Sequence, residues 1–350
     1  MVDFWNHLFN SQKEVCTLNI AYKQNDTGFQ SVKFDAEQIP GIEAIEIELY
    51  NSLSGSQGTM REMCSHILNA GGKRIRPLLV LHSGLGFGTM SNHLVKAAVA
   101  AELIHMASLV HDDIIDNSSL RRSRPSINKI WGNQFAVLCG DYLFSKAFGI
   151  MSSNRLMRSM DLMVEAIQNM CEGEIVQAGE RFNPLISQER YYEIIGMKTA
   201  IFLSCCCKSG AAISGATKLQ VHMMGEYGLH LGYAFQIIDD ILDFCGKVEN
   251  MGKPRCEDLR QGNITLPAIM LLNNDHYKEK IVDVISKKGF TEQECDGIVS
   301  DLEASGTVDR CFALAVYHIE KAKESLELMP QSEHMTFLRN LADVLKARAN

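Results

Sequence analysis

The chain has 350 residues, of which 46% are hydrophobic and 22% charged, so it can bury a large core. Its formal net charge is −8, and it shows no basic stripe with interleaved aromatic residues. This balance speaks against a nucleic-acid-binding protein. The low proline count of seven and the abundance of Leu, Met, Ala, Glu and Lys favour helices over strands.

The eleven cysteines show neither a CxxC pair nor the Cys/His spacing of a zinc site. Cys205, Cys206 and Cys207 are consecutive, so they point in different directions on a helix. We expect small buried thiols in a reducing cytoplasm rather than a disulfide framework. The first residues lack the basic and apolar regions of a signal peptide, and the apolar strip 210–215 is too short to cross a bilayer. No transmembrane segment is therefore expected.

Residues 1–40 are polar and mixed, which predicts a poorly ordered arm or a short helix. From Ile42 to Ala349 the helical pattern is nearly continuous and is broken only by short turns rich in Gly, Ser or Pro. Helical segments of roughly 12 to 28 residues suit antiparallel helices joined by short loops. We predict an all-α fold in which residues 41–350 form one large helical bundle.

A basic cluster comes first along this bundle, in the sequence GGKRIRP at 71–77. Lys73 and Arg76 are three residues apart and share a helix face. Gly72 would let the backbone approach a phosphate closely, and arginine offers a bidentate fork. The alternative is an ordinary helix start, where basic side chains are poorly placed against the helix dipole.

An aspartate cluster ends the next apolar helix. Asp112, Asp113 and Asp116 stand at i, i+1 and i+4, so two carboxylates share a face and the third lies beside them. Such carboxylates repel one another unless a cation lies between them, and oxygen ligands suit Mg²⁺. His105 lies two turns earlier on the same face; it is either a satisfied core residue or a ligand for an anion.

A second cluster repeats this spacing at Asp239, Asp240 and Asp243, again at the end of an apolar helix. Either cluster alone could be a solvated helix end or an N-cap. Two copies, each within an apolar helix, favour a metal site. Other candidates for binding an anionic substrate lie near the clusters or on apolar helices: Arg121, Arg122, Lys198, Thr199, Gln236 and Lys253.

Together these segments resemble the trans-isoprenyl diphosphate synthase (polyprenyl synthetase) family, and within it the large component II of heptaprenyl diphosphate synthases and other long-chain synthases. The resemblance covers most of the chain from about residue 42. Six sequence blocks carry it: GGKRIRP at 71–77, LVHDDIIDNSSLRR at 109–122, GDYLF at 140–144, KTA at 198–200, FQIIDDILDF at 235–244 and GKPRCEDLRQGNITLP at 252–267.

The resemblance implies an isoprenoid-synthase bundle with a central cavity, the two aspartate clusters facing across its mouth. It implies an enzyme that condenses isopentenyl diphosphate with an allylic diphosphate. The aspartates would hold Mg²⁺, three ions with substrate bound, through Asp112, Asp113, Asp116, Asp239, Asp240 and Asp243. Asp112, Asp113, Asp116, Lys198, Asp239 and Asp240 would be catalytic. The allylic diphosphate would contact Arg121, Lys198, Thr199, Gln236 and Lys253. Isopentenyl diphosphate would contact Gly72, Lys73, Arg76, His105 and Arg122.

Product length is expected to depend on Ala107 and Ser108, about one turn before Asp112. In the family, bulky aromatic residues at these positions stop elongation early, so two small residues imply a long-chain product. We expect a heptaprenyl or similar chain built on farnesyl diphosphate for quinone side chains. Alternatively, both are packing positions and another side chain blocks the channel, which would give a geranylgeranyl or other short-chain synthase.

Two further readings concern the class of protein. A class I terpene cyclase would carry an Asn/Ser/Glu triad in place of the second aspartate cluster. A non-catalytic or partner-dependent subunit of a heteromeric synthase would typically lose its aspartates, whereas all six are present. The resemblance implies a homodimer, or a heteromer with a small component I-type subunit. It also implies transient membrane contact for product release.

Overall fold

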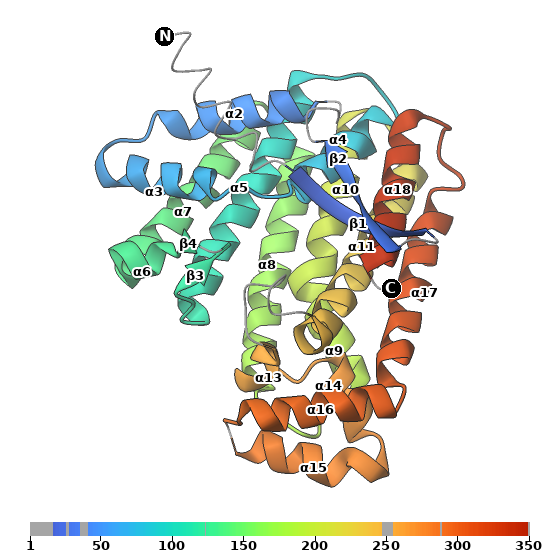
Figure 1. Ribbon diagram of the computed structural model, residues 1–350. Coiled ribbons are helices and arrows are strands. Elements are labelled where there is room, and N and C mark those ends of the chain that lie inside the picture. The colour runs from blue at the N-terminus through green and yellow to red at the C-terminus, as the bar shows by residue number, and fades with distance from the viewer. Residues whose placement is uncertain are drawn as a thin grey trace. The chain divides into compact units, whose positions relative to one another are not determined.

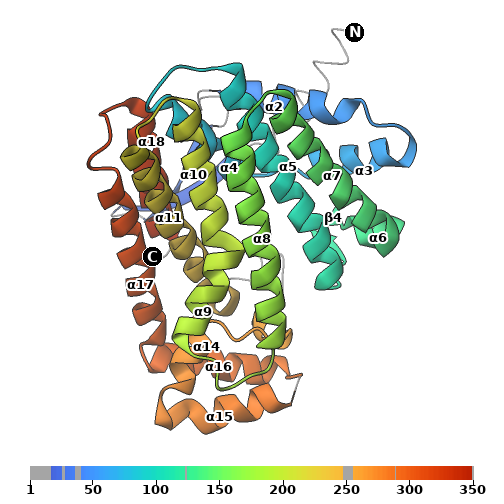
Figure 2. The ribbon, with the colours of Figure 1, turned by 180° about the vertical axis from the view of Figure 1, so that it is seen from behind.

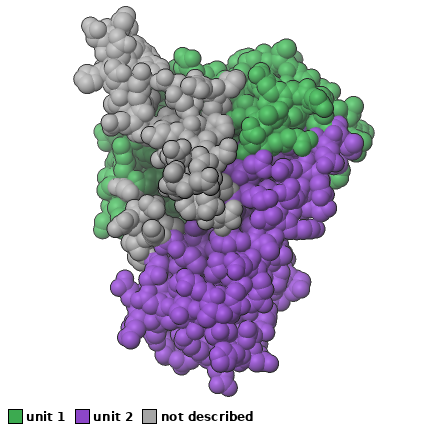
Figure 3. Space-filling view, turned by 45° about the vertical axis from the view of Figure 1, so that its right-hand side comes forward, with its two compact units in different colours: residues 1–163, 206–222, 329–340 green, residues 164–205, 223–328, 341–350 purple. Residues whose placement is uncertain are grey.

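The computed structural model (Figure 1) describes residues 17–25, 28–35, 41–122, 124–246, 255–287 and 289–348. These residues are almost all helical, and the all-α prediction is confirmed. The chain divides into two compact units (Figure 3). The first comprises residues 1–163, 206–222 and 329–340, and the second comprises residues 164–205, 223–328 and 341–350.

The first unit is built around a long apolar helix, α5. It begins after Ser91, whose side chain accepts a hydrogen bond from the Leu94 amide at 3.2 Å. Most faces of α5 carry buried residues, and the helix lies against α4 and α7 (Figures 1 and 2). The helices wholly within this unit are α2 (Ile42–Ser54), α3 (Gly58–Asn69), α4 (Ile75–Leu85), α5 (Asn92–Ile115), α6 (Ile127–Trp131) and α7 (Asn133–Ser153).

The second unit contains a helical stretch interrupted by one π-helical turn, η2. Its complete elements are α9 (Gln188–Ile195), η2 (Gly196–Ala200), α13 (Glu257–Arg260), α14 (Leu266–Leu272), α15 (Asp275–Ser286), α16 (Glu292–Ala304) and α17 (Thr307–Ser325). Helices with residues in both units are α8 (Met157–Gly179), α10 (Ile201–Ile213), α11 (Lys218–Cys245) and α18 (Glu333–Arg348).

Two short hairpins depart from the helical pattern. Strands β1 (Thr17–Asn25) and β2 (Gly28–Asp35) pair antiparallel, with Thr17 opposite Asp35. The sequence analysis expected a poorly ordered arm or a short helix over residues 1–40; alternating apolar residues, as at Leu18, Ile20 and Tyr22, are typical of strands. Strands β3 (Leu120–Arg121) and β4 (Arg124–Pro125) form the second hairpin, just after α5. The rest of the predicted arm, residues 1–16, 26–27 and 36–40, lies outside the described residues.

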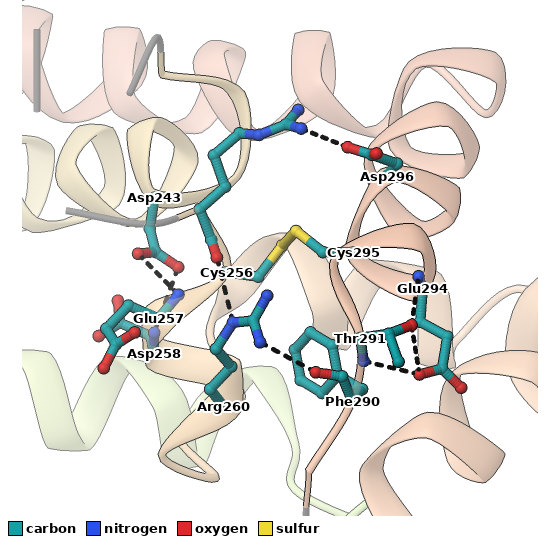
Figure 4. Close-up of a disulfide and its surroundings, with 11 residues drawn as sticks. Asp243, Cys256, Glu257, Asp258, Arg260, Phe290, Thr291, Glu294, Cys295 and Asp296 are labelled. Carbon is teal, nitrogen blue, oxygen red and sulfur yellow. Dashed lines mark hydrogen bonds and ion pairs between the residues drawn. A yellow bond between two sulfur atoms is a disulfide. The ribbon is translucent and has the colours of Figure 1, made fainter. Parts of the chain in front are cut away.

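One cysteine pair corrects the prediction that all thiols are free. Cys256 and Cys295 form a disulfide of 2.07 Å in the second unit, where α13 and α16 begin (Figure 4). They are 39 positions apart, so no local spacing could have revealed the pair. The other described cysteines are free thiols, and Cys205, Cys206 and Cys207 are buried as predicted.

Among the described residues, three helical stretches have the length and apolar composition of a membrane span: α5, α7 and Gln188–Ile213. The expectation of no such segment, which rested on the strip 210–215, overlooked them. Within the protein, 72% of the apolar window is buried in α5 and in Gln188–Ile213, but only 33% in α7. Packing therefore accounts for the apolar residues of the first two stretches, whereas α7 leaves an apolar face exposed.

Candidate functional site

The first aspartate cluster lies at the C-terminal end of α5, followed at once by the β3–β4 hairpin. Asp113 is 4% exposed, and its carboxylate forms an ion pair with Arg121, whose Nε donates at 2.9 Å. The backbone oxygen of Asp113 accepts hydrogen bonds from the Ser118 amide at 2.9 Å and the Asn128 side chain at 3.0 Å, which hold the hairpin against the helix end. Asp112 and Asp116 are half-buried. The fold therefore brings Arg121 to the cluster, as predicted.

The loop before α4 is fixed by an arginine that the sequence analysis did not single out. Arg74 has a left-handed backbone, with φ at 52°. Its buried guanidinium donates to Glu46 at 2.6 Å and to Glu102 at 2.8 Å. Burial lowers the pKa of Arg74, but Glu102 and Glu46 outweigh burial and raise it. The only signal in the sequence was Glu102, a charged residue inside the apolar run of α5.

Several arginines of this unit act on His105. A Cβ atom at Gly72 would lie 2.8 Å from Nη1 of Arg122, so the absence of a side chain lets that guanidinium lie on the loop backbone. The pKa of His105 is well below its usual value because burial, then Arg76, Arg122, Arg121 and Arg74, disfavour the imidazolium. Neutral His105 thus stands in a strongly positive field, which suits an anionic ligand.

The two chain-length candidates differ in their surroundings. Ser108 is half-buried and lies three residues after His105 and four before Asp112, hence on the same face of α5. Its hydroxyl donates to the backbone oxygen of His105 at 2.9 Å. Ala107 has no exposed surface at all and packs inside the unit. Of these two candidates, Ser108 is the one that borders the accessible face of the helix.

In the second unit, the predicted cation Lys198 lies within the π-turn η2. Its ammonium pairs with Glu174 at 2.5 Å and donates to the side-chain oxygen of Gln177. A Cβ atom at Gly173 would lie 2.9 Å from Cγ of Lys198, so this glycine gives room to the lysine stem. Lys198 is predicted to contact the allylic diphosphate, and in this structure its ammonium is paired with the carboxylate of Glu174. Neither Glu174 nor Gln177 was among the predicted site residues.

The second aspartate cluster divides into one accessible and two buried carboxylates. Asp239 is half-buried, whereas Asp240 is 2% and Asp243 is 9% exposed. Asp240 accepts hydrogen bonds from the Tyr191 hydroxyl at 2.7 Å and from the Gln236 amide at 2.9 Å. Burial, followed by the negative charge of Asp258, raises the pKa of Asp240.

Asp243 caps the helix that follows it in space (Figure 4). Its two carboxylate oxygens accept from the backbone amides of Glu257 at 3.2 Å and Asp258 at 3.3 Å, at the start of α13. Its backbone oxygen accepts from the Cys256 amide at 2.9 Å. Burial and the charge of Asp258 raise the pKa of Asp243 to about 7. Both carboxylate oxygens of Asp243 are therefore bonded to the start of α13, next to the disulfide.

The donor set suits a hard cation that is shared with a ligand. In the described part of the chain, no three His, Cys, Asp or Glu side chains converge into a cage that would hold a metal by itself. Mg²⁺ in proteins is typically bound by one or two carboxylates and completes its shell with water and substrate phosphate oxygens. The half-buried carboxylates of each cluster fit that role by themselves: Asp112 and Asp116 in the first unit, and Asp239 in the second. Lys253, predicted to bind the allylic diphosphate, lies outside the described residues.

Comparison with known proteins supports the same assignment. The sequence profile of the polyprenyl synthetase family matches residues 57–302. The chain is 38% identical over 302 residues to component 2 of heptaprenyl diphosphate synthase from Geobacillus stearothermophilus, covering 86% of this chain and 93% of that protein. It is 33% identical to geranylgeranyl diphosphate synthase from Methanosarcina mazei, covering 81% of this chain and 88% of that protein.

The fold also agrees with solved structures. A polyprenyl synthase from Caulobacter crescentus, solved with calcium and isoprenyl diphosphate, superposes with a TM-score of 0.84 at 32% identity and covers 90% of this chain and 95% of that one. Heptaprenyl diphosphate synthase from Staphylococcus aureus gives 0.82 at 31% identity and covers 88% of this chain and 98% of that one. The chain therefore belongs to the polyprenyl synthetase family and is a prenyltransferase.

Proposed function

We propose that this prenyl diphosphate synthase makes a long-chain all-trans polyprenyl diphosphate, heptaprenyl or similar, from isopentenyl diphosphate and farnesyl diphosphate, for quinone side chains. The observation that carries the length is the small Ser108, which lies on the accessible face of α5 one turn below Asp112. A small side chain there leaves the path of the growing chain open. The heptaprenyl synthase relatives point the same way.

Mg²⁺ is the cofactor of this proposal, with three ions once substrate is bound. Asp112, Asp113 and Asp116 would hold it from the first cluster, and Asp239 with Asp240 from the second; Asp243 would contribute only by leaving α13. When bound, Mg²⁺ stabilises negative charge on the departing diphosphate. The Caulobacter crescentus structure contains a divalent cation together with an isoprenyl diphosphate, which supports this assignment.

The protein's own residues would hold the two substrates. Lys198 and Arg121, with Thr199, Gln236 and Lys253, would contact the allylic diphosphate and offset its charge. Gly72, Lys73, Arg76 and Arg122 would hold isopentenyl diphosphate, and neutral His105 would donate a hydrogen bond to it. The allylic C–O bond then breaks, the isopentenyl alkene attacks the resulting cation, and the released diphosphate takes the proton that leaves.

Product chromatography tests the proposed length. The enzyme is incubated with farnesyl diphosphate, excess isopentenyl diphosphate and Mg²⁺, and the dephosphorylated products are separated by length. Products beyond C20 are expected. A sole C20 product would establish the geranylgeranyl alternative, which is the activity named for the Methanosarcina mazei relative.

Substitution of the aspartates tests the metal assignment. Full prenyl transfer and an unchanged Mg²⁺ requirement in Asp112→Ala and Asp239→Ala would contradict it.

The partners form a second part of the proposal. The component 2 relatives favour a small component I-type partner, without which the chain would be an inactive or weakly active subunit. A homodimer is favoured by the exposed apolar residues of α6 and α7 in the first unit: Ile130, Phe135, Val137 and Leu138, each more than 40% exposed. Turnover by the purified chain alone would remove the need for a small subunit. Sedimentation of wild type and Leu138→Glu tests the apolar face, since the charged variant should dissociate.

The same proposal places residues 41–350 in one catalytic domain that works in the cytoplasm, with transient membrane contact as the apolar product leaves. Expression of residues 41–350 tests the boundary. The shortened chain is expected to keep the catalytic turnover of the full one, and loss of turnover in a folded product would assign residues 1–40 to the catalytic domain.

A further inference from the structure

Tyr191 is a buried tyrosine whose hydroxyl donates a hydrogen bond to a carboxylate. It lies on α9, 3% exposed, and donates to Oδ2 of Asp240 on α11 at 2.7 Å. A phenol hydroxyl is protonated at neutral pH, so it is the donor of this hydrogen bond. The mechanism above assigns Tyr191 no role.

The second oxygen of Asp240 is held from another direction. Nε2 of Gln236, one turn earlier on α11, donates to Oδ1 at 2.9 Å. A carboxylate only accepts, so the amide must present its NH₂ group to Asp240 and its oxygen to the other side. There the Thr199 hydroxyl of η2 donates to it at 2.9 Å. Thr199 thus fixes the amide, and the amide fixes the carboxylate.

Among the described residues, each oxygen of Asp240 therefore has one protein donor and retains a second lone pair. A carboxylate pinned at both oxygens cannot rotate about its Cβ–Cγ bond without losing a buried hydrogen bond. Groups that orient a metal ligand in this way set how well the ligand binds, and their loss typically costs 10- to 100-fold in metal affinity.

We propose that Tyr191 is a positioning residue that, with the Thr199–Gln236 relay, holds the Asp240 carboxylate in the orientation needed for the Mg²⁺–diphosphate complex. This inference rests on the proposed function, because it takes Asp240 as part of the metal site. It adds a residue that no motif contains and gives Thr199 and Gln236 a role toward the carboxylate besides substrate contact.

Calorimetry without turnover tests the inference. Mg²⁺ is titrated into the full chain in the presence of saturating inorganic pyrophosphate, with wild type, Tyr191→Phe and Tyr192→Phe compared. Tyr192 is the matched control, because it is half-buried beside Tyr191 and its ring packs against Tyr191, Tyr233 and His318. We expect the Kd for Mg²⁺ to rise about 10-fold or more in Tyr191→Phe and to stay within about twofold in Tyr192→Phe.

A double-mutant cycle separates positioning from a general structural role. If Tyr191 acts through Asp240, Tyr191→Phe should add no further loss of Mg²⁺ affinity in an Asp240→Asn background. In steady-state assays the Mg²⁺ concentration for half-maximal rate should rise in Tyr191→Phe, while the KM for isopentenyl diphosphate stays within about twofold. If Tyr191→Phe does not fold, Thr199→Val releases the carboxylate from the other side and should weaken Mg²⁺ binding in the same direction.

The outcomes are distinguishable. Wild type that binds Mg²⁺ no better with pyrophosphate than without it would overturn the proposed metal site and this inference with it. Wild type that binds normally, with Tyr191→Phe equal to it or with additive losses in the cycle, would overturn only the role of Tyr191.

Discussion

Breaking the Cys256–Cys295 disulfide should destabilise the second unit, by an amount that depends on the number of residues between the two cysteines. For a loop closed over 39 positions, the loss of unfolded-state entropy on cross-linking is about 13 cal/mol/K, or ~4 kcal/mol at 25 °C. With an unfolding entropy near 2.1 cal/mol/K per residue, this corresponds to a fall in Tm of about 5 °C for the whole chain. We therefore expect Cys256→Ser/Cys295→Ser to melt about 5 °C below oxidised wild type.

The assay is thermal unfolding with and without dithiothreitol. Reductant should lower the Tm of wild type to that of the double variant and leave the double variant unchanged. Cys171→Ser is the matched control, since it removes an exposed free thiol and should still respond to reductant. Of the ten cysteines that the structure describes, two are bonded and eight are free thiols, so reduction in denaturant should add two to the thiols that react with Ellman's reagent. Eleven reactive thiols before reduction, or a wild-type Tm that reductant does not move, would refute the bond.

Three further predictions concern the first unit, the proposed substrate site and pH. Arg74→Ala leaves buried Glu102 without its cation and should lower the free energy of unfolding in guanidinium by roughly 3–5 kcal/mol. Arg74→Met/Glu102→Met should recover most of that stability. A loss below about 1 kcal/mol in Arg74→Ala would contradict the buried pair. Gly72→Ala puts a Cβ atom 2.8 Å from the Arg122 guanidinium and should raise the KM for isopentenyl diphosphate about tenfold, with melting unchanged as the control. The buried imidazole of His318 has its pKa lowered from 6.5 to about 4, so its contribution to stability is complete above pH 6.5 and is lost as pH falls through 4. Denaturant unfolding should show a free energy of unfolding lower by up to about 3 kcal/mol at pH 4. In His318→Gln this free energy should depend less steeply on pH. An unchanged dependence would contradict the lowered pKa of His318.

Helices and charged clusters were readable from the sequence because their signals are local. The apolar run before Asp112 and the i, i+1, i+4 spacing of the aspartates both lie within a few turns. The family follows from several such blocks in order. These local patterns were enough for the all-α fold, for the helix ends that carry the aspartates and for Arg121 beside Asp113.

What the sequence could not reveal depends on contacts between distant segments. Arg74 lies between two cations of a basic block, yet its partners are 28 residues away on either side. Tyr191 is 49 positions from Asp240, and Cys256 is 39 from Cys295. The β1–β2 hairpin was missed for a different reason, because a polar composition outweighed a weak alternation of apolar residues.

The π-helical turn η2 makes the alignment of Tyr191 and Thr199 more sensitive to a one-residue insertion than to a one-residue deletion. Tyr191 precedes the turn and Thr199 lies within it, eight residues apart, yet both reach the same helix, α11. At 3.6 residues per turn, eight residues would leave their side chains about 80° apart. The wider turn, bonded from i to i+5, takes up roughly one additional residue and restores the alignment. Removing one residue between them would convert this turn into a regular one with seven residues between the two side chains, only about 20° from alignment, whereas inserting one residue would rotate Tyr191 about 80° away from Asp240.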